Sequence, residues 1–347
     1  MNRPSKYFFL LLIFLIPFYT GFDYTNVDSY AYDTITDMAG RTVLLKKSTS
    51  RIISTFKPAS LCVFSLGLEK QLVGIDTSSR KDRLFQAVMP EVEKIVAVGS
   101  KSAGLNFETM TALKPDLVIL YAQKDGSALA EKFKKMGIPA IIILPETFDS
   151  VKTSLDIIAA ASHEPERAVR VTTAMDNLLS EIKKRTKTIP EHKKITGYFA
   201  SPRGLFSTAT GNMLQDEMFQ MAGMINAAHH LNGYFQDISP EQFIKWNPDL
   251  VVLSQHMGRL PAKNLKNPAF KTMKAFQSRS IYRFPSNLAP WDFPSPLSAL
   301  GVLWLGKTAY PSIFSDIQMD KTIDEFHKIL FNKTFTEMRG KTDEKVF

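Results

Sequence analysis

The sequence predicts an α/β protein with two similar lobes, mainly parallel sheets and a ligand cleft between the lobes. Three observations support this prediction. Short β-rich runs alternate with helical stretches over most of the 347 residues. A 14-residue sequence pattern, the repeated phrase described below, occurs twice, and one helical segment is long enough to span two lobes. Strands that alternate with helices form mainly parallel sheets covered on both faces. A local device that is built twice suggests one copy in each lobe, and two lobes imply a cleft.

The first half of the chain begins with a hairpin that turns at Ala39-Gly40 and then alternates strands with helices. Strands are expected at 51–55, 72–76, 95–99, 117–122 and 140–144, with helices near 58–67, 106–113, 127–136 and 149–161. The second half repeats the pattern, with strands at 195–200, 250–254 and 280–284 and helices near 213–222, 267–273, 297–309 and 319–331. These elements divide the mature chain into an N-terminal lobe at 32–160, a linker at 161–190, a C-terminal lobe at 191–332 and a polar tail at 333–347, which is expected to fray.

The segment 164–186 is expected to form one long helix. It contains no Gly, and its only Pro is Pro165, which is tolerated in a first helical turn. Its apolar residues recur at helical spacing, at Ala168, Val171, Met175, Leu178, Leu179 and Ile182. About 23 residues, rising about 1.5 Å each, make a rod of about 35 Å. Such a helix is long enough to span two lobes.

The repeated phrase occurs at 106–119 and at 239–252. Each copy has a helix-capping residue, a Glu two positions later, a Pro-Asp pair after the same gap, and then an apolar run. The two acids, Glu108 and Glu241, fall in the first turn of a short helix, where a carboxylate interacts favourably with the helix dipole. Two interpretations stay open: helix-cap chemistry used twice, or exposed carboxylates at matching lobe tips that meet a two-fold partner.

Composition and motifs argue against several functional classes. The formal net charge of +9 is compatible with nucleic acid, a membrane surface or an anionic ligand, but the Lys and Arg residues are scattered, so nucleic-acid binding is not expected. A bare-metal site is not expected either, because the six His residues are dispersed, at 163, 192, 229, 230, 256 and 327. No phosphate-binding loop, His-Glu-x-x-His or Gly-x-Ser-x-Gly motif occurs, so no enzyme activity is expected.

The N-terminus has the pattern of a secretory signal. Arg3 and Lys6 precede an apolar stretch from Tyr7 to Tyr19, and residues 1–31 are expected to be a signal peptide cleaved after Ala31. An uncleaved membrane anchor is the alternative. The single cysteine, Cys62, excludes an intramolecular disulfide, and the lack of an early cysteine argues against a lipid-modified N-terminus. The mature chain is therefore expected to be periplasmic or secreted.

Several segments occur in an order and spacing that resemble a known family. They are Asp-Met-Ala-Gly-Arg-Thr-Val at 37–43, Arg-Ile-Ile-Ser at 51–54, Leu-Val-Gly-Ile at 72–75, both Pro-Asp-Leu-Val segments, Ala222-Gly223 with Asn226, and Trp-Asp-Phe-Pro-Ser-Pro at 291–296. Together they resemble the solute-binding proteins of ABC importers for iron chelates, vitamin B12 and haem, in the class with a single long linker helix. One departure is Leu61, where relatives often have Glu, which puts a pocket or helix-start contact there in doubt.

The resemblance implies two Rossmann-like α/β lobes, joined by one long helix, with the ligand held in the cleft. In relatives such as the vitamin B12 binder, the Glu in each phrase pairs with arginines of the dimeric permease, and Glu108 and Glu241 occupy those positions. It also implies a monomer, with no cofactor and no metal held by the protein alone, that hands a small-molecule metal chelate to a permease in the inner membrane.

Ligand contacts are expected in loops at the C-terminal ends of the strands. The candidate residues are Lys57, Tyr121, Gln123, Arg203, Phe206, Phe235, His256, Trp291 and Phe293. Aromatic walls suit a large planar or apolar chelate, whereas Arg203 and Lys57 suit an anionic ferric siderophore or a carboxylate-bearing macrocycle. We therefore expect a carrier of an iron chelate of the siderophore type. A corrinoid, haem or other chelate carrier and a membrane-tethered sensor of the same fold remain alternatives.

Overall fold

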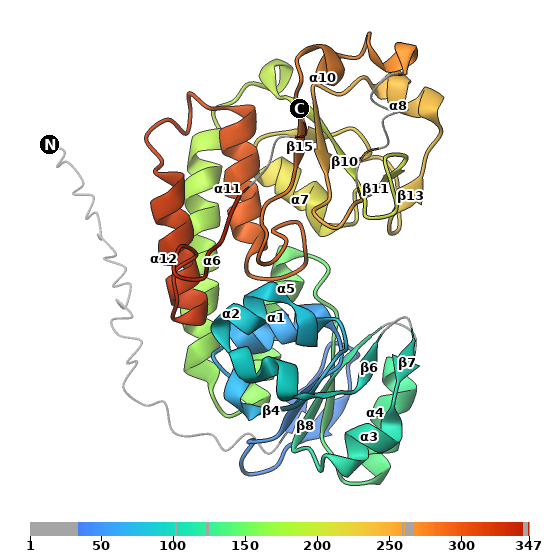
Figure 1. The fold of residues 1–347 in the computed structure, drawn as a ribbon, viewed down its shortest axis with the longest axis vertical. Helices are drawn as coiled ribbons and strands as arrows, with labels where there is room; N and C mark the ends of the chain where they lie inside the picture. The colour runs from blue at the N-terminus through green and yellow to red at the C-terminus, as the bar shows by residue number, and fades with distance from the viewer. Residues whose placement is uncertain are drawn as a thin grey trace, which may run out of the picture. The chain divides into compact units, whose positions relative to one another are not determined.

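The computed structural model describes residues 34–100, 103–122, 125–258, 260, 267–342 and 346 (Figure 1). The expected signal peptide at 1–31 and the expected ligand contact Gln123 lie outside these residues. Within them, two sheets form the centres of two α/β lobes, which confirms the fold class predicted from the sequence.

The N-terminal lobe has a five-stranded, fully parallel sheet in the order β5-β4-β3-β8-β9. Its strands are β3 (Ile52–Ser54), β4 (Leu72–Ile75), β5 (Val96–Ala97), β8 (Leu117–Tyr121) and β9 (Ala140–Ile143). Alternate residues enter opposite core layers: Ile119 and Ile141 pack on one face, and Leu120 and Ile142 on the other. Both faces are therefore buried, as a parallel sheet requires.

Helices cover both faces of this sheet. They are α1 (Lys57–Ser65), α2 (Arg83–Val88), α3 (Phe107–Ala112), α4 (Gly126–Lys135) and α5 (Phe148–Ala161). Two hairpins complete the lobe, β1 (Thr34–Thr36) with β2 (Thr42–Leu44), and β6 (Gly99–Ser100) with β7 (Gly104–Leu105). The first is the hairpin expected near Ala39-Gly40. The second, and helix α2, were not expected from the sequence.

The C-terminal lobe has a mixed sheet in the order β13-β11-β10-β14-β15, with β12 beside β10. Its central strands β10 (Thr196–Ala200), β14 (Leu250–Leu253) and β15 (Ile281–Arg283) are parallel, as is β12 (Ile225–Asn226). Strand β11 (Ser207–Thr208) runs antiparallel to both of its neighbours, β10 and β13 (Gln236–Asp237). The helices are α7 (Leu214–Met221), α8 (Pro240–Trp246), α10 (Lys274–Gln277), α11 (Ser298–Ala309) and α12 (Met319–Phe331).

The helix expected at 267–273 is wrong. The chain makes only a 3₁₀ turn at Pro268–Phe270, and α10 starts at Lys274. Met273 between them is extended, with ψ of 141°, and is buried with Phe270 in the lobe core. Packing of these two side chains therefore interrupts the helical pattern that their spacing suggested.

The expected linker helix is confirmed as α6 (Pro165–Thr186), which runs beside α11 and α12 in Figure 1. Five of the predicted apolar residues form its buried stripe, Ala168, Val171, Met175, Leu179 and Ile182, whereas Leu178 is half-buried. Near its C-terminal end, Arg185 pairs with Asp316 (Nη1–Oδ1, 2.6 Å) and Glu181 (Nε–Oε1, 2.9 Å). Among the described residues, no helix combines the length and the apolar character that crossing a membrane requires.

The tail beyond α12 is packed rather than frayed over 333–342. Phe335 and Met338 are buried, and the Phe335 ring lies 4.8 Å from the ring of His327 and 6.1 Å from that of Trp291. Lys333 Nζ donates to the carbonyl oxygens of Ala87 (2.7 Å) and Val88 (3.1 Å) at the end of α2. Phe335 therefore packs this stretch against the C-terminal lobe, and Lys333 joins it to the N-terminal lobe.

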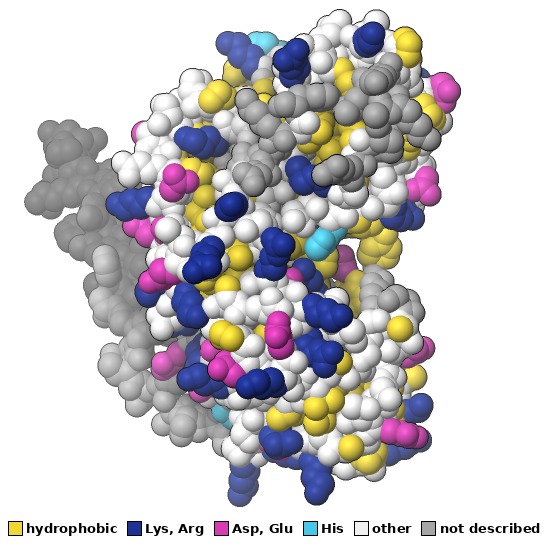
Figure 2. Space-filling model, viewed as in Figure 1, with side chains coloured by type: hydrophobic (Ala, Val, Ile, Leu, Met, Phe, Trp, Pro, Cys, Tyr) yellow, Lys and Arg dark blue, Asp and Glu magenta, His cyan; other side chains and the backbone are white. Residues whose placement is uncertain are grey.

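The charged side chains on the face shown in Figure 2 are of mixed sign. Lys and Arg side chains of the described residues lie over both lobes in this view, with Asp and Glu side chains among them. This distribution agrees with the scattered positions of the basic residues in the sequence.

Candidate ligand-binding cleft

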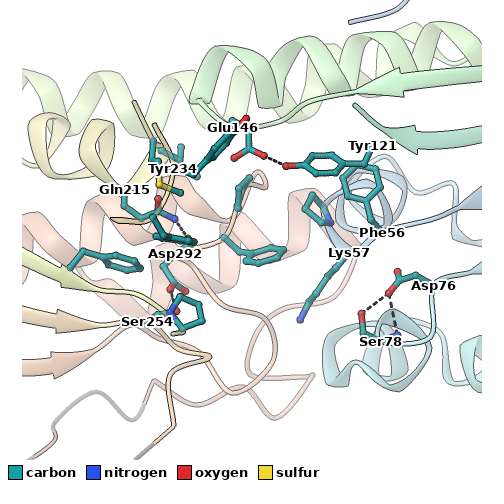
Figure 3. Close-up of a pocket in the computed structure, with 18 of the residues that line it drawn as sticks. Phe56, Lys57, Asp76, Ser78, Tyr121, Glu146, Gln215, Tyr234, Ser254 and Asp292 are labelled. Atoms are coloured by element: carbon teal, nitrogen blue, oxygen red, sulfur yellow. Dashed lines mark hydrogen bonds between the residues drawn. The ribbon is translucent and has the colours of Figure 1, made fainter. Parts of the chain in front are cut away.

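A cavity of about 640 Å³ lies between the two lobes (Figure 3). Its N-lobe side is formed by Phe56, Lys57, Pro58, Asp76, Ser78, Ser100, Tyr121 and Glu146. Its C-lobe side is formed by Phe199, Pro202, Met213, Leu214, Gln215, Tyr234, Phe235, Ser254, Asp292, Phe293 and Pro294. The walls are thus largely aromatic and apolar, with a small number of placed polar groups, as expected for a small-molecule site.

The N-lobe wall is an aromatic pair held at the ends of two strands. Phe56 follows β3 and Tyr121 ends β8, and their ring centroids lie 4.7 Å apart at 44°. The Tyr121 hydroxyl donates to the carboxylate of Glu146. Burial, followed by this contact, raises the pKa of Tyr121, so its phenol stays protonated.

Lys57 is the cationic side chain of the described lining, but its charge is compensated by a carboxylate. Its Nζ lies 2.7 Å from Asp82 Oδ2, in a pair whose side chains are 14% and 7% exposed. Asp82 Oδ1 also accepts from the backbone N–H of Leu84 and so caps α2. The Lys57 Nζ lies 5.8 Å from the ring centroid of Phe293 and thus contacts the opposite lobe. Lys57 therefore ties the two walls together with its charge already compensated.

The C-lobe end of the cavity is polar and buried. Asp292 Oδ2 accepts from the Ser254 hydroxyl (2.6 Å) and from the Gln255 backbone N–H (3.3 Å). Gln215 Nε2 donates to the backbone carbonyl of Asp292 (2.8 Å). Burial raises the pKa of Asp292 to about 6, against the lowering effect of the Ser254 hydrogen bond. Figure 3 shows these three side chains together, on the side of the cavity opposite Phe56 and Lys57.

Four of the ligand contacts expected from the sequence line this cavity: Lys57, Tyr121, Phe235 and Phe293. Four others do not, and Gln123 lies outside the described residues. Trp291 is fully buried against Phe335, and Phe206 packs edge-on against Phe243 in the C-lobe core.

Arg203 and His256 lie beside the lining rather than in it. Arg203 is half exposed and bonds to Ser207 Oγ (3.0 Å) and the carbonyl of Phe235, so that it supports a wall residue. The ring of His256 lies 5.9 Å from that of Phe293. Desolvation of the ring, followed by the charge of Lys57, lowers the pKa of His256, so its imidazole is neutral at pH 7.

The predicted contacts omit most polar residues of the lining, among them Asp76, Glu146, Gln215, Ser254 and Asp292. Asp76 follows β4 and Glu146 follows β9. The expectation that ligand contacts lie in loops after strands could therefore have identified both residues. Gln215 lies in the first turn of α7, and no strand-end signal marks it. No group of three or more His, Cys, Asp or Glu residues suited to a metal ion occurs within the described ranges.

The two copies of the repeated phrase start α3 and α8 in the same way. Asn106 Oδ1 accepts from the Thr109 N–H (2.9 Å), and Ser239 Oγ accepts from the Gln242 N–H (3.1 Å). Glu108 and Glu241 are both exposed in the first turn. Donors at the helix start, its own backbone N–H first and the Ser239 hydroxyl second, lower the pKa of Glu241. The cap chemistry predicted from the sequence is confirmed in both lobes.

The two copies of the repeated phrase also resemble each other after their helix caps. The residue before each proline has positive φ, 46° at Lys114 and 43° at Asn247. The N–H groups of Asp116 and Asp249 each donate, at 2.8 Å, to a carbonyl at the start of a central strand, that of Arg51 just before β3 and that of Thr196 in β10. Each phrase is therefore one unit that places an exposed carboxylate on a lobe surface, and Figure 1 shows α3 and α8 in different lobes.

Comparison with known proteins identifies the class to which this fold and cleft belong. The chain belongs to the periplasmic binding protein family, whose model matches residues 52–288. It therefore has the architecture of the substrate-binding components of ABC importers, which are transport components rather than enzymes, in the class with two α/β lobes and one long linker helix.

Individual relatives are distant but extensive. The molybdate-binding protein MolA of Haemophilus influenzae is 22% identical over 329 residues, 87% of this chain and 91% of that protein. Its molybdate-bound structure aligns with a TM-score of 0.77 at 21% identity, over 87% of this chain and 98% of that one. The Fe(3+)-citrate-binding protein YfmC of Bacillus subtilis is 26% identical over 63% of this chain and 68% of its own length. CeuE of Helicobacter pylori with Ni(II) bound aligns with a TM-score of 0.75 at 24% identity, covering 88% and 98%.

Proposed function

We propose that this chain captures an iron chelate of the ferric siderophore type between its lobes and delivers it to the permease of an ABC importer. The observation that carries this proposal is the aromatic-walled cavity of about 640 Å³. A volume of this order suits a drug-sized ligand rather than a single ion. The aromatic faces of Phe56, Tyr121, Phe235 and Phe293 would pack on a large organic chelate.

A tetrahedral oxyanion is a second candidate, because the similarity to the molybdate-binding protein extends over 87% of the chain. The described lining gives it less support. The cation Lys57 is paired with Asp82, and Asp76, Glu146 and Asp292 place carboxyl groups around the cavity. An anion would therefore face carboxyl groups and a lysine whose charge is already compensated.

Titration by tryptophan fluorescence tests the two candidates together. Trp291 is buried and directly precedes Asp292 and Phe293, which line the cavity. The fluorescence emission of Trp291 should therefore report ligand entry. The panel contains a ferric trihydroxamate, ferric citrate, cobalamin, haem and molybdate. We expect a ferric chelate to bind with a dissociation constant below about 10 μM, or about −7 kcal/mol. Binding of molybdate alone would replace the proposal with the second candidate, and binding of none would refute both.

A pair of variants locates the site. Phe293→Ala removes a wall of the cavity and should weaken chelate binding by about tenfold, the loss expected from about 1.4 kcal/mol of contact. Phe206→Ala removes an aromatic side chain of the same lobe that does not line the cavity, and should leave the affinity unchanged. Equal effects of the two variants would show that the chelate binds elsewhere.

We further propose that Glu108 and Glu241 are the carboxylates that dock onto the permease dimer, one from each lobe. Their matching first-turn positions and exposure support this role, since exposed charges set orientation and association rate at interfaces. The double variant Glu108→Ala, Glu241→Ala should abolish uptake while leaving chelate affinity intact. Glu166→Ala is the matched control, because Glu166 is also exposed in the first turn of a helix, α6. Loss of chelate affinity in the double variant would show these carboxylates to be structural.

A further inference from the structure

The polar end of the cavity holds two buried acceptor oxygens that have no hydrogen-bond partner among the described residues. They are Gln215 Oε1 and Asp292 Oδ1. Gln215 is 5% exposed and Asp292 is 4% exposed, and both line the cavity. Buried polar groups in proteins are normally paired, so two such atoms at one end of a binding cavity indicate that a ligand completes them.

The identity of the Gln215 atom is fixed by its neighbour. The backbone carbonyl of Asp292 can only accept, so the Gln215 atom 2.8 Å from it must be the amide nitrogen. The amide oxygen Oε1 is then the atom without a hydrogen-bond partner. Asp292 is similar, because Oδ2 takes the Ser254 hydroxyl and the Gln255 N–H and leaves Oδ1 without a donor.

Several side-chain donors of the lining are committed to carboxylates of the chain itself. Lys57 is paired with Asp82, and the hydroxyl groups of Ser78, Tyr121 and Ser254 donate to Asp76, Glu146 and Asp292 respectively. At the end that holds Gln215 and Asp292, the described cavity therefore offers acceptors to its ligand, and the Tyr234 hydroxyl, a lining donor without a hydrogen-bond partner among the described residues, is exposed. This balance favours a ligand that brings N–H or O–H groups and disfavours one that brings only acceptors.

We propose that Gln215 and Asp292 form a subsite for a hydrogen-bond donor of the cargo, an ammonium, amide N–H or hydroxyl group at the edge of the chelate. This inference rests on the proposed function, since it assigns the chelate a chemical feature and an orientation. A chelate with such a group is bound with it turned toward the C-lobe, where it completes Oε1 of Gln215 and Oδ1 of Asp292.

A matched pair of ligands separates the donor from its charge. One is a ferric trihydroxamate with a terminal ammonium group, and the other is the same chelate with that nitrogen trimethylated, which keeps the charge but has no N–H at that position. The wild-type protein should prefer the ammonium form by about tenfold or more, which corresponds to about one hydrogen bond to a charged group. Asp292→Asn and Gln215→Met should each reduce this preference to within about threefold, and the circular dichroism spectrum and melting temperature of each variant serve as the control for folding.

The pH dependence gives a second readout. Burial raises the pKa of Asp292 to about 6, so its carboxylate is an acceptor at pH 7.5 and becomes protonated below pH 6. The charges that act on Asp292 are Lys57, which lowers the pKa of Asp292, and Arg283, whose own pKa is lowered by burial against the raising effect of Asp292. The preference for the ammonium form should fall as the pH drops from 7.5 to 5 in the wild type, and stay flat in Asp292→Asn.

The outcomes distinguish the two proposals. If both chelates bind the wild type equally, or if both variants keep the preference, the subsite is refuted while the chelate-binding function stands. If neither chelate binds, both proposals fail. A preference that the two variants abolish, while both variants stay folded, supports the subsite.

Discussion

Replacing Asp292 by Asn should stabilise the unliganded protein at pH 8 and have little effect near pH 4. Asp292 is 4% exposed, and burial is the largest influence on its carboxyl group. The pKa rises from 3.8 to about 6 in spite of the hydrogen bonds from Ser254 and Gln255. A pKa change of one corresponds to about 1.36 kcal/mol, so a rise of about two amounts to about 3 kcal/mol.

The sign follows from proton linkage. Because the folded-state pKa lies above the unfolded value, folding favours the protonated carboxyl group. The stability contributed by this group is fully present below about pH 4 and is lost as the pH rises through about 6. An Asn side chain is neutral at every pH and does not incur this loss. The free energy of unfolding of the variant should therefore exceed that of the wild type by an amount that grows from pH 4 and levels off at about 3 kcal/mol near pH 8.

Urea unfolding of both proteins without ligand, from pH 4.5 to pH 8, measures this difference. Asp125→Asn is a suitable control, because Asp125 is exposed and makes no side-chain cap bond at the start of α4. It should run parallel to the wild type over the whole range. A constant gap between Asp292→Asn and the wild type, or a wild type that is the more stable protein at pH 8, would refute the reasoning that Asp292 is buried and ionised.

Three further predictions concern groups outside the ligand subsite. Phe335→Ala should lower the free energy of unfolding by about 3–5 kcal/mol in urea, because it removes a buried ring; a loss below about 1 kcal/mol would show the tail to be unpacked. Cys62 is fully buried, which raises the pKa of its thiol to about 12, so an aromatic disulfide reagent at pH 8 should label it only in urea; rapid labelling of the native protein would contradict this burial. Lys57→Met leaves Asp82 buried without its partner and should cost about 3–5 kcal/mol, part of which Asp82→Asn in the same chain should restore; an additive second loss would argue against the ion pair.

Much of the fold could be predicted because its elements are coded locally. The buried runs Leu117–Tyr121 and Leu250–Leu253 are short, apolar and bounded by turn signals, and both became central strands. Helix α6 has its Pro in the first turn and its apolar stripe at helical spacing, as predicted. The prediction that the tail frays was wrong for 333–342. The average polarity of this segment hid the packing of Phe335 against Trp291 and His327.

The candidate site was predictable only in part. Strand ends point into the cleft, which is why Tyr121 and Lys57 line it as expected. Residue type, however, does not reveal which way a loop side chain turns. Trp291 and Phe293 are two positions apart, yet the first is fully buried in the protein core and the second lines the cavity.

The range of the interactions explains why the helix caps were easier to predict than the polar end of the cavity. The caps that expose Glu108 and Glu241 form between residues three positions apart, so a short phrase contains the whole device and can be recognised in each copy. The polar end of the cavity depends instead on pairings across 38 residues, from Ser254 to Asp292, and across 77 residues, from Gln215 to Asp292. The acceptors that remain available to the ligand therefore depend on which long-range hydrogen bonds form within the folded chain. The chemistry that selects a cargo is therefore a property of the folded cavity and not of any segment that lines it.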